Sequence, residues 1–175
     1  MKTFLYTMLF LTLPLYAMAD ASKEKLVVMR AIDNNGIGKI IGILKLKNTS
    51  DGLEITPDIA ELTPGAHGFH LHQNPSCEAG EKDGKKVAGL AAGGHFDPNN
   101  TGKHEGPHGF GHEGDFAILM VAPDGGSEQA VYAPKLTVED VVNHSFVIHA
   151  NSDNYSDTPL PLGGTGARIA CGVVD

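Results

Sequence analysis

The stretch GFHLH, residues 68–72, alternates apolar and imidazole side chains. Successive side chains of a β-strand point to opposite faces, so this pattern predicts a strand with His70 and His72 on one face. The phenylalanine and the leucine between them would fill the protein interior. The stretch SFVIHA, residues 145–150, repeats the arrangement and places His149 on the outward face. The sequence therefore predicts two strands that each have an apolar inner face and histidine on the outer face.

Strand-like alternation bounded by turn sequences extends over the whole chain. The expected strands are residues 26–32, 39–47, 53–58, 65–72, 116–121, 130–136, 145–150 and 168–174. Asn and Gly in DNNG, residues 33–36, are a strong hairpin signal. Only residues 138–142 have the pattern of a helical turn. Eight short strands in a chain of this size predict a single all-β domain, either a sandwich or a barrel.

Two long segments interrupt this pattern, residues 73–114 and 151–167. Both are rich in Gly, Pro, Asn and Asp and show no periodicity. Loops of this length in compact domains are usually functional or disordered. The first segment contains Cys77 and several histidines, which favours a functional loop. We expect both loops to cover the outward-facing histidines of the strands.

The first nineteen residues have the features of a secretory signal peptide. Lys2 precedes an apolar run at residues 4–16, and AMA at residues 17–19 fits a cleavage site. We expect residues 1–19 to be removed, which leaves a mature domain of residues 20–175. A short membrane anchor is the alternative, but the run is too short to cross about 30 Å of hydrocarbon. The chain is therefore expected to be exported into an oxidising compartment.

Charge and cysteine content narrow the class of protein further. The net charge is −8 and no basic stripe is present, which argues against nucleic acid and anionic membranes as partners. The two cysteines, Cys77 and Cys171, both lie in the mature part. An even number of cysteines in an exported protein predicts a disulfide, with two free thiols as the alternative.

Four more potential metal ligands follow in glycine-rich surroundings. They lie in GGHFDP, KHEGP and GHEGD, and are His95, His104, His112 and Asp115. Imidazole suits copper and zinc, and three imidazoles with one carboxylate make a plausible closed zinc site. His108 lies between two of these histidines and is an alternative ligand. The sequence thus predicts a metal site between the strands and the long loops.

The chain resembles the copper-zinc superoxide dismutases of the bacterial, exported type. The matching motifs are GFHLH, AGGHFDP, KHEGP, GHEGD, HANSDNYSD, PLGG and GARIACGV. They occur in order and span essentially the whole mature chain. The resemblance implies an eight-stranded antiparallel Greek-key barrel or sandwich with two long functional loops.

The resemblance also implies which residues bind each metal. Copper would be held by His70, His72, His95 and His149, and zinc by His95, His104, His112 and Asp115. His95 would serve both metals as a bridging imidazolate, deprotonated because two cations share one ring. One copper and one zinc per chain would be the cofactors.

The same resemblance implies roles around the metals. Arg168 and His95 would be the catalytic residues. Arg168 would position superoxide over copper, because its guanidinium is a permanent cation with a rigid donor fork. A Cys77–Cys171 disulfide would anchor the first loop. Asp153 would link a copper histidine to a zinc histidine, with Asp157 as the alternative.

The implied activity is dismutation of superoxide to oxygen and hydrogen peroxide. Copper would alternate between Cu(II) and Cu(I), and zinc would fix the bridging ring. We expect a periplasmic protein, free of the membrane after signal removal, and either a monomer or a homodimer. The alternatives are a copper and zinc buffering or delivery protein of the same fold without turnover, and a zinc hydrolase. A hydrolase would need an open zinc position, which four protein ligands do not leave.

Overall fold

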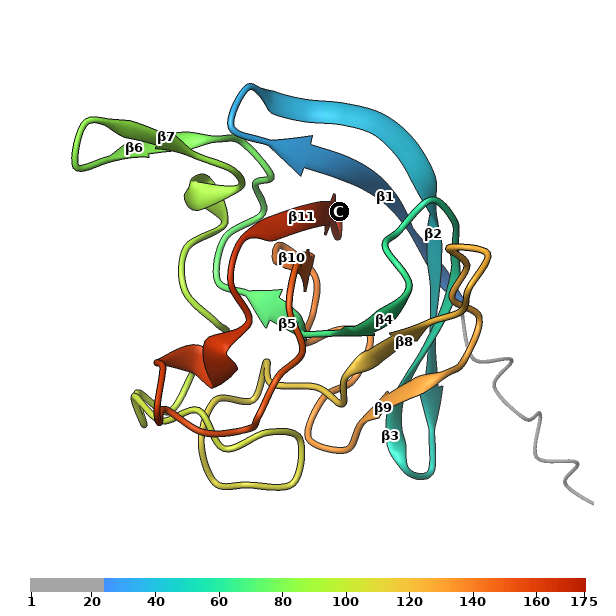
Figure 1. The fold of residues 1–175 in the computed structure, drawn as a ribbon. Helices are drawn as coiled ribbons and strands as arrows, with labels where there is room; N and C mark the ends of the chain where they lie inside the picture. The colour runs from blue at the N-terminus through green and yellow to red at the C-terminus, as the bar shows by residue number, and fades with distance from the viewer. Residues whose placement is uncertain (1–23) are drawn as a thin grey trace, which may run out of the picture.

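Seven antiparallel strands form one strongly curled sheet in the computed structural model, which describes residues 24–175. The strand order is β5-β10-β11-β1-β2-β3-β9, and Figure 1 shows how the sheet bends into a half-barrel. The strands are β1 Lys25–Asp33, β2 Gly36–Thr49, β3 Gly52–Ile59, β5 Phe69–His72, β9 Val131–Ala133, β10 Ser145–His149 and β11 Arg168–Val173. The predicted signal peptide, residues 1–19, lies outside the described residues.

Shorter elements complete the fold. Two separate strand pairs join β4 Gly65–His67 to β8 Leu119–Val121 and β6 Gly80–Lys82 to β7 Lys85–Val87. Two short 3-10 turns are η1 Leu90–Ala92 and η2 Leu162–Gly164. The first strand, β1, pairs with the last, β11, and β5 pairs with the distant β10. The predicted all-β antiparallel Greek-key fold is confirmed.

All eight expected strand segments contain a strand, but their extents differ in places. The segment 65–72 is divided at Gly68, whose backbone N–H donates to Asn151 O at 2.8 Å. The segment 116–121 is a strand only over β8. The expected helical turn at 138–142 is a series of turns, with Val142 N donating to Glu139 O at 3.4 Å.

Three phenylalanines fix the strands that carry the histidines. Phe69 of β5 and Phe146 of β10 have ring centroids 5.7 Å apart, and Phe116 lies 5.4 Å from Phe69. All three side chains are buried in the main core cluster. Each such burial stabilises the fold by about 1.5–3 kcal/mol. This packing holds the inner faces of β5 and β10 and thereby sets the direction of their outer faces.

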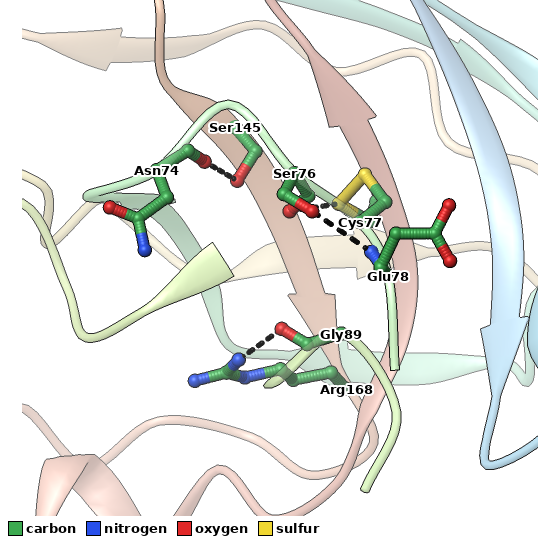
Figure 2. Close-up of a disulfide and its surroundings, with 8 residues drawn as sticks. Asn74, Ser76, Cys77, Glu78, Gly89, Ser145 and Arg168 are labelled. Carbon is green, nitrogen blue, oxygen red and sulfur yellow. Dashed lines mark hydrogen bonds between the residues drawn. A yellow bond between two sulfur atoms is a disulfide. The ribbon is translucent and has the colours of Figure 1, made fainter. Parts of the chain in front are cut away.

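A second, smaller core cluster lies on the outer side of β10 and β11. It contains Val147 together with the disulfide between Cys77 and Cys171, which confirms the predicted pairing. Figure 2 shows the disulfide joining the loop after β5 to β11. The disulfide therefore attaches the first part of this long loop to β11.

The first loop also contains regular structure that we did not predict. Strands β6 and β7 form a hairpin around Asp83 and Gly84, whose φ angles are 53° and 71°. Positive φ at both central residues is typical of the tight turns that Asp-Gly sequences form. Across residues 24–175 no helix has the length and apolar character needed to cross a membrane.

Candidate metal centre

The histidines of β5 and β10 lie side by side on the outer face of the sheet. β5 and β10 pair in antiparallel orientation with Val147 opposite His70, which brings the histidines of the two strands close together. His70, His72 and His149 are nonetheless almost fully buried, at 0, 0 and 4% exposure. The two long loops cover them, as the alternation of side chains predicted.

The first loop is attached to β5 by two isolated β-bridges. One pairs His72 with His95, and the other pairs His70 with Asp115. Backbone N–H groups and carbonyls of residues 94–96 and of Gly114 bond to β5 and its neighbours at 2.8–3.0 Å. Residues far apart in the sequence are thereby held against the strand histidines.

Four imidazoles form a first tight group of potential metal ligands. In this group, one ligand atom from each of His70, His72, His95 and His149 lies within 4.8 Å of the others. Nε2 of His72 lies 3.4 Å from Nε2 of His149. Nδ1 of His70 and Nε2 of His95 have no hydrogen-bond partner among residues 24–175. Unpaired buried nitrogens are costly unless something else, such as a metal ion, satisfies them.

Hydrogen bonds at the opposite ring nitrogens set the orientation of each imidazole. Nδ1 of His72 lies 3.0 Å from Gly93 O, and Nδ1 of His149 lies 3.3 Å from Gly166 O. A carbonyl only accepts hydrogen bonds, so Nδ1 carries the proton in both rings. The Nε2 lone pairs then remain available for a metal ion. These bonds prepare both rings as ligands.

A second group lies on the other side of His95. One ligand atom from each of His70, His95, His104 and Asp115 lies within 4.8 Å of the others. Nδ1 of His95 is 2.8 Å from Asp115 Oδ1. Nδ1 of His104 is 2.8 Å from Asp115 Oδ2, but these two atoms are not aligned for a hydrogen bond. Two polar atoms that lie this close without a hydrogen bond between them can both be ligands of one cation.

The fourth predicted zinc ligand, His112, lies at the edge of this second group. Its Nδ1 is 3.4 Å from Asp115 Oδ1. The tightest group therefore contains His70 in its place. Nε2 of His70, however, is hydrogen-bonded to Asp153, which leaves Nδ1 as the nitrogen of this ring available to a metal ion. The structure thus brings together all four residues of the predicted zinc set.

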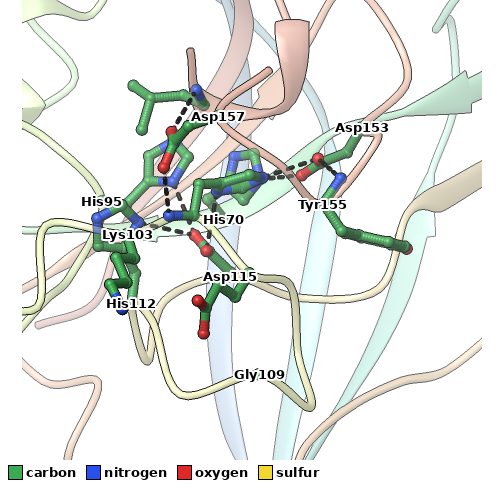
Figure 3. Close-up of polar contacts among 12 residues, drawn as sticks. His70, His95, Lys103, Gly109, His112, Asp115, Asp153, Tyr155 and Asp157 are labelled. Atoms are coloured by element: carbon green, nitrogen blue, oxygen red, sulfur yellow. Dashed lines mark hydrogen bonds and ion pairs between the residues drawn. The ribbon is translucent and has the colours of Figure 1, made fainter. Parts of the chain in front are cut away.

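Asp153 connects the two groups by contacting one histidine of each. Its Oδ2 lies 2.7 Å from Nε2 of His70, and its Oδ1 lies 2.8 Å from Nε2 of His104. Figure 3 shows Asp153 and Asp115 reaching the histidines from separate segments. Asp157, the alternative for this position, instead accepts a hydrogen bond from the backbone N–H of His104 at 3.0 Å.

The protonation states of His95 and Asp115 also fit metal binding. Burial, followed by the neighbouring His70, lowers the pKa of His95 to about 3. Burial alone would raise the pKa of Asp115, but the polar contacts with the surrounding histidines, His104 first, hold it well below its usual range. A neutral imidazole and an ionised carboxylate are the forms that bind metal ions. Nitrogen donors with one carboxylate suit copper and zinc.

Arg168 lies beside the first group at the start of β11. It is paired with His149 across the sheet. Its guanidinium donates to the carbonyls of Gly89 and Gly93, the latter at 2.6 Å. Figure 2 shows the bond from Arg168 to Gly89 below the disulfide at Cys77. A half-buried cation is therefore fixed next to the imidazoles.

Comparison with known proteins adds an independent finding. The family model for copper/zinc superoxide dismutase (SODC) matches residues 40–174. The chain belongs to this family. Copper-zinc superoxide dismutase 2 of Salmonella typhimurium is 49% identical over 164 residues, which cover 93% of this chain and 94% of that protein.

Solved structures agree with the family assignment. The copper/zinc superoxide dismutase from Brucella abortus has a TM-score of 0.86 and 47% identity, covering 87% of this chain and all of that one. The solution structure of the monomeric enzyme from Salmonella enterica has a TM-score of 0.80, also with 47% identity and 87% coverage. The predicted family is confirmed.

As a member of the copper/zinc superoxide dismutase family, the chain is an oxidoreductase that dismutates superoxide, with copper and zinc as its cofactors. The histidine groups described above are where the residues can hold those metals. His108, the alternative ligand, is exposed and belongs to neither group.

Sequence reasoning named Asp153 as a link between two rings, but it did not identify the backbone carbonyls that contact two rings of the first group. The carbonyls of Gly93 and Gly166 contact His72 and His149. Their glycine-rich surroundings indicated turns, but not which carbonyl would reach which ring. Thr165, whose hydroxyl lies 3.3 Å from His149 Nδ1, was also missed. The only local sequence signal for it is a threonine between two glycines.

Proposed function

We propose that the first group holds copper and the second holds zinc, with His95 shared between them. Copper would be bound by His70, His72, His95 and His149, and zinc by His95, His104, His112 and Asp115. The observation that carries this assignment is the orientation of His95. Its Nδ1 is directed at Asp115, its Nε2 has no hydrogen-bond partner among residues 24–175, and the residue is part of the four-imidazole group.

The residues then divide the work of the reaction. Copper bound at the first group would supply one-electron redox chemistry, exchanging an electron with each of two superoxide anions. Arg168 binds and orients the anion through a charge that does not depend on pH. When it is not bound to copper, Nε2 of His95 would hold one proton and deliver it to the peroxide product, and solvent would supply the second proton. The loops exclude bulk water from the buried nitrogens.

The zinc residues serve a structural purpose in this proposal. Four protein ligands leave no open position for substrate. Asp153 holds the zinc ligand His104 in a fixed orientation through a bond of 2.8 Å to Nε2, the ring nitrogen opposite the one nearest Asp115. Asp153 also contacts the copper ligand His70, so a displacement in one group is transmitted to the other. Bonds of this kind, to the side of a ligand away from the metal, orient it and tune the metal.

Metal analysis combined with a direct superoxide-decay assay tests this assignment. We expect one copper and one zinc per chain, and rapid decay. His149→Ala should lose copper and activity while it retains zinc, and the exposed His108→Ala is the matched control. Full metal loading with no decay would support the buffering or delivery alternative instead. Retention of copper by His149→Ala would contradict the ligand set.

We further propose that residues 1–19 direct export to the periplasm and that the mature protein comprises residues 20–175. The bacterial origin of the similar proteins supports this location. Sequencing the N-terminus of protein recovered from a periplasmic fraction should give Asp20 first. Protein that keeps Met1 and stays with the membrane fraction would support the anchor alternative.

For the oligomeric state we propose a monomer. The relative from Salmonella enterica, at 47% identity, is described as monomeric. A homodimer is favoured by one observation, an apolar strip on β1 and β2 formed by Leu26, Val28, Ile37 and Ile40 at 42–59% exposure. Light scattering of the purified protein decides between them. A dimer mass that Val28→Lys reduces to a monomer mass would overturn the proposal.

A further inference from the structure

We propose that Thr165 is a positioning residue for the copper ligand His149. Together with Asp157 it forms a second hydrogen-bonded connection between the copper and zinc ligands, in addition to Asp153. This inference rests on the ligand sets proposed above. It concerns how the loop of residues 151–167 controls the geometry of both metals.

The direction of the hydrogen bonds at Thr165 follows from their partners. Thr165 is 3% exposed, and its Oγ1 lies 3.3 Å from His149 Nδ1 and 3.2 Å from Leu162 O. Nδ1 of His149 also faces Gly166 O and is therefore a donor. The threonine hydroxyl must accept from His149 and donate to Leu162 O. The ring is thus held by two acceptors instead of one.

The connection continues through Leu162 to the zinc side. The backbone N–H of Leu162 donates to Asp157 Oδ1 at 3.1 Å. The other oxygen of Asp157 accepts from the backbone N–H of His104 at 3.0 Å. Each carboxylate oxygen of Asp157 therefore accepts from one backbone N–H group. A continuous path therefore runs from His149 to His104.

Two features show that this path is held in place. Leu162 has a φ of 53°, which a non-glycine residue adopts only where surrounding contacts favour it. The methyl group of Thr165 packs against Gly68, where an added Cβ would lie 2.4 Å from Thr165 Cγ2. The threonine is fixed by the break between β4 and β5 as well as by its hydroxyl. Its hydroxyl can therefore restrain the His149 ring.

Replacing the hydroxyl by a methyl group of similar size tests the first part. In Thr165→Val the packing on Gly68 is kept, and His149 Nδ1 retains only Gly166 O. We expect roughly tenfold weaker copper binding and a changed Cu(II) electron paramagnetic resonance spectrum, in line with losses at residues that orient metal ligands. Thr165→Ser should restore both.

The matched control is Ser127→Ala, which removes another buried hydroxyl that donates to a carbonyl, Met120 O at 2.9 Å, outside both ligand groups. It should leave the copper spectrum and affinity as in the wild type. If Thr165→Val matched this control in both measurements, the positioning role would be wrong. If instead His149→Ala kept the copper spectrum, the ligand set itself would be wrong, which separates the two failures.

The connection to zinc is tested by a double-mutant cycle. Asp157→Ala should weaken zinc binding and shift the copper spectrum in the same direction as Thr165→Val. Because both variants interrupt one path, their combined effect on the copper spectrum should be smaller than the sum of the separate effects. Strictly additive effects, or a copper spectrum unchanged by Asp157→Ala, would overturn the second connection.

Discussion

Nδ1 of His95 lies 2.8 Å from Oδ1 of Asp115, while Nε2 of the same ring has no hydrogen-bond partner among the described residues, and His95 is grouped with His70, His72 and His149. Both nitrogens of one imidazole are therefore directed at potential metal positions. The β-bridge between His72 and His95 fixes the backbone that carries this ring. A change at His95 should consequently affect both metals.

The first prediction contrasts His95 with His149. His95→Ala should lose activity and weaken the binding of copper and of zinc, because a donor is removed from each group. His149→Ala should weaken copper binding alone. Metal titrations of the metal-free variants, followed by superoxide-decay measurements, distinguish the two. Unchanged zinc affinity in His95→Ala would show that the ring is not shared.

The second prediction concerns the cation beside the copper ligands. Arg168→Ala should lower the rate constant at low superoxide concentration by roughly tenfold, because a local positive charge raises the encounter rate with an anion. The loss should shrink at high salt, where charges are screened. The rate constant is measured by pulse radiolysis over a range of ionic strength.

Arg30→Ala is the control for that experiment, since it removes the same charge from the exposed face of β1. It should change the rate constant little. Equal losses in both variants would mean that total charge matters and that the position of Arg168 beside His149 does not.

The third prediction is about the disulfide. Replacing Cys77 and Cys171 together by Ala should lower the free energy of unfolding by about 4–5 kcal/mol in the chain-entropy view, because the bridge joins residues 94 positions apart. The loop that supplies Gly89 and Gly93 to Arg168 should also become mobile. Urea unfolding of both proteins, with metals bound, measures the first effect. A loss under about 1 kcal/mol would indicate that metal ions alone hold the loop.

Acid should destabilise the metal-free protein through its buried imidazoles. The pKa of His95 is lowered to about 3 by burial. An unfolded histidine titrates near 6.5, so between pH 6.5 and about 3 the unfolded state binds more protons than the folded state. Stability must then fall as the pH falls through this window. The free energy of unfolding, measured from pH 8 downward, should show that decline.

The variant His95→Gln isolates this contribution, because its amide does not titrate. Below pH 6.5 its free energy of unfolding should change less steeply with pH, because unfolding would take up as much as one proton fewer than in the wild type. The exposed His108→Gln should retain the wild-type slope. Identical slopes in all three proteins would contradict a lowered pKa at His95.

The side-chain alternation in the sequence predicted much of the site because it is a local property. In β5, burial of Phe69 forces His70 and His72 to the opposite face, whatever the rest of the chain does. The same argument placed His149 on β10. The cover over these rings was also predictable, since two long loops had no other role. The pairing of Cys77 with Cys171 was predictable because these are the two cysteines of a chain that is expected to be exported to an oxidising compartment.

Other features depend on the path of the loops and could not be predicted in this way. The hairpin of β6 and β7 has an Asp83-Gly84 turn, but its strands are too short and too charged to show a period. The contacts of Gly93 O and Gly166 O with the rings involve backbone atoms, which carry no sequence signal. The bonds of Asp153 to His70 and His104 also span distant segments. Their exact pairing emerges only when the sheet brings those segments together.

The last prediction concerns Gly163, where the second loop passes over Asp153. A Cβ added at this position would lie 1.9 Å from Asp153 Oδ1 and 2.8 Å from His104 Nε2, and the φ of 70° is itself unfavourable for alanine. Gly163→Ala should therefore displace the carboxylate from His70 and His104 and weaken zinc binding by roughly tenfold or more.

Gly164→Ala is the control, since its φ of 68° carries the same backbone cost, but an added Cβ would meet only Leu160 at 3.6 Å or more. Zinc affinities of the two variants separate strain in the loop from displacement of Asp153. Equal losses would assign the effect to the backbone conformation. A loss confined to Gly163→Ala would show that the close approach of the loop to Asp153 holds the zinc ligands, because the two variants differ in what the added methyl group meets.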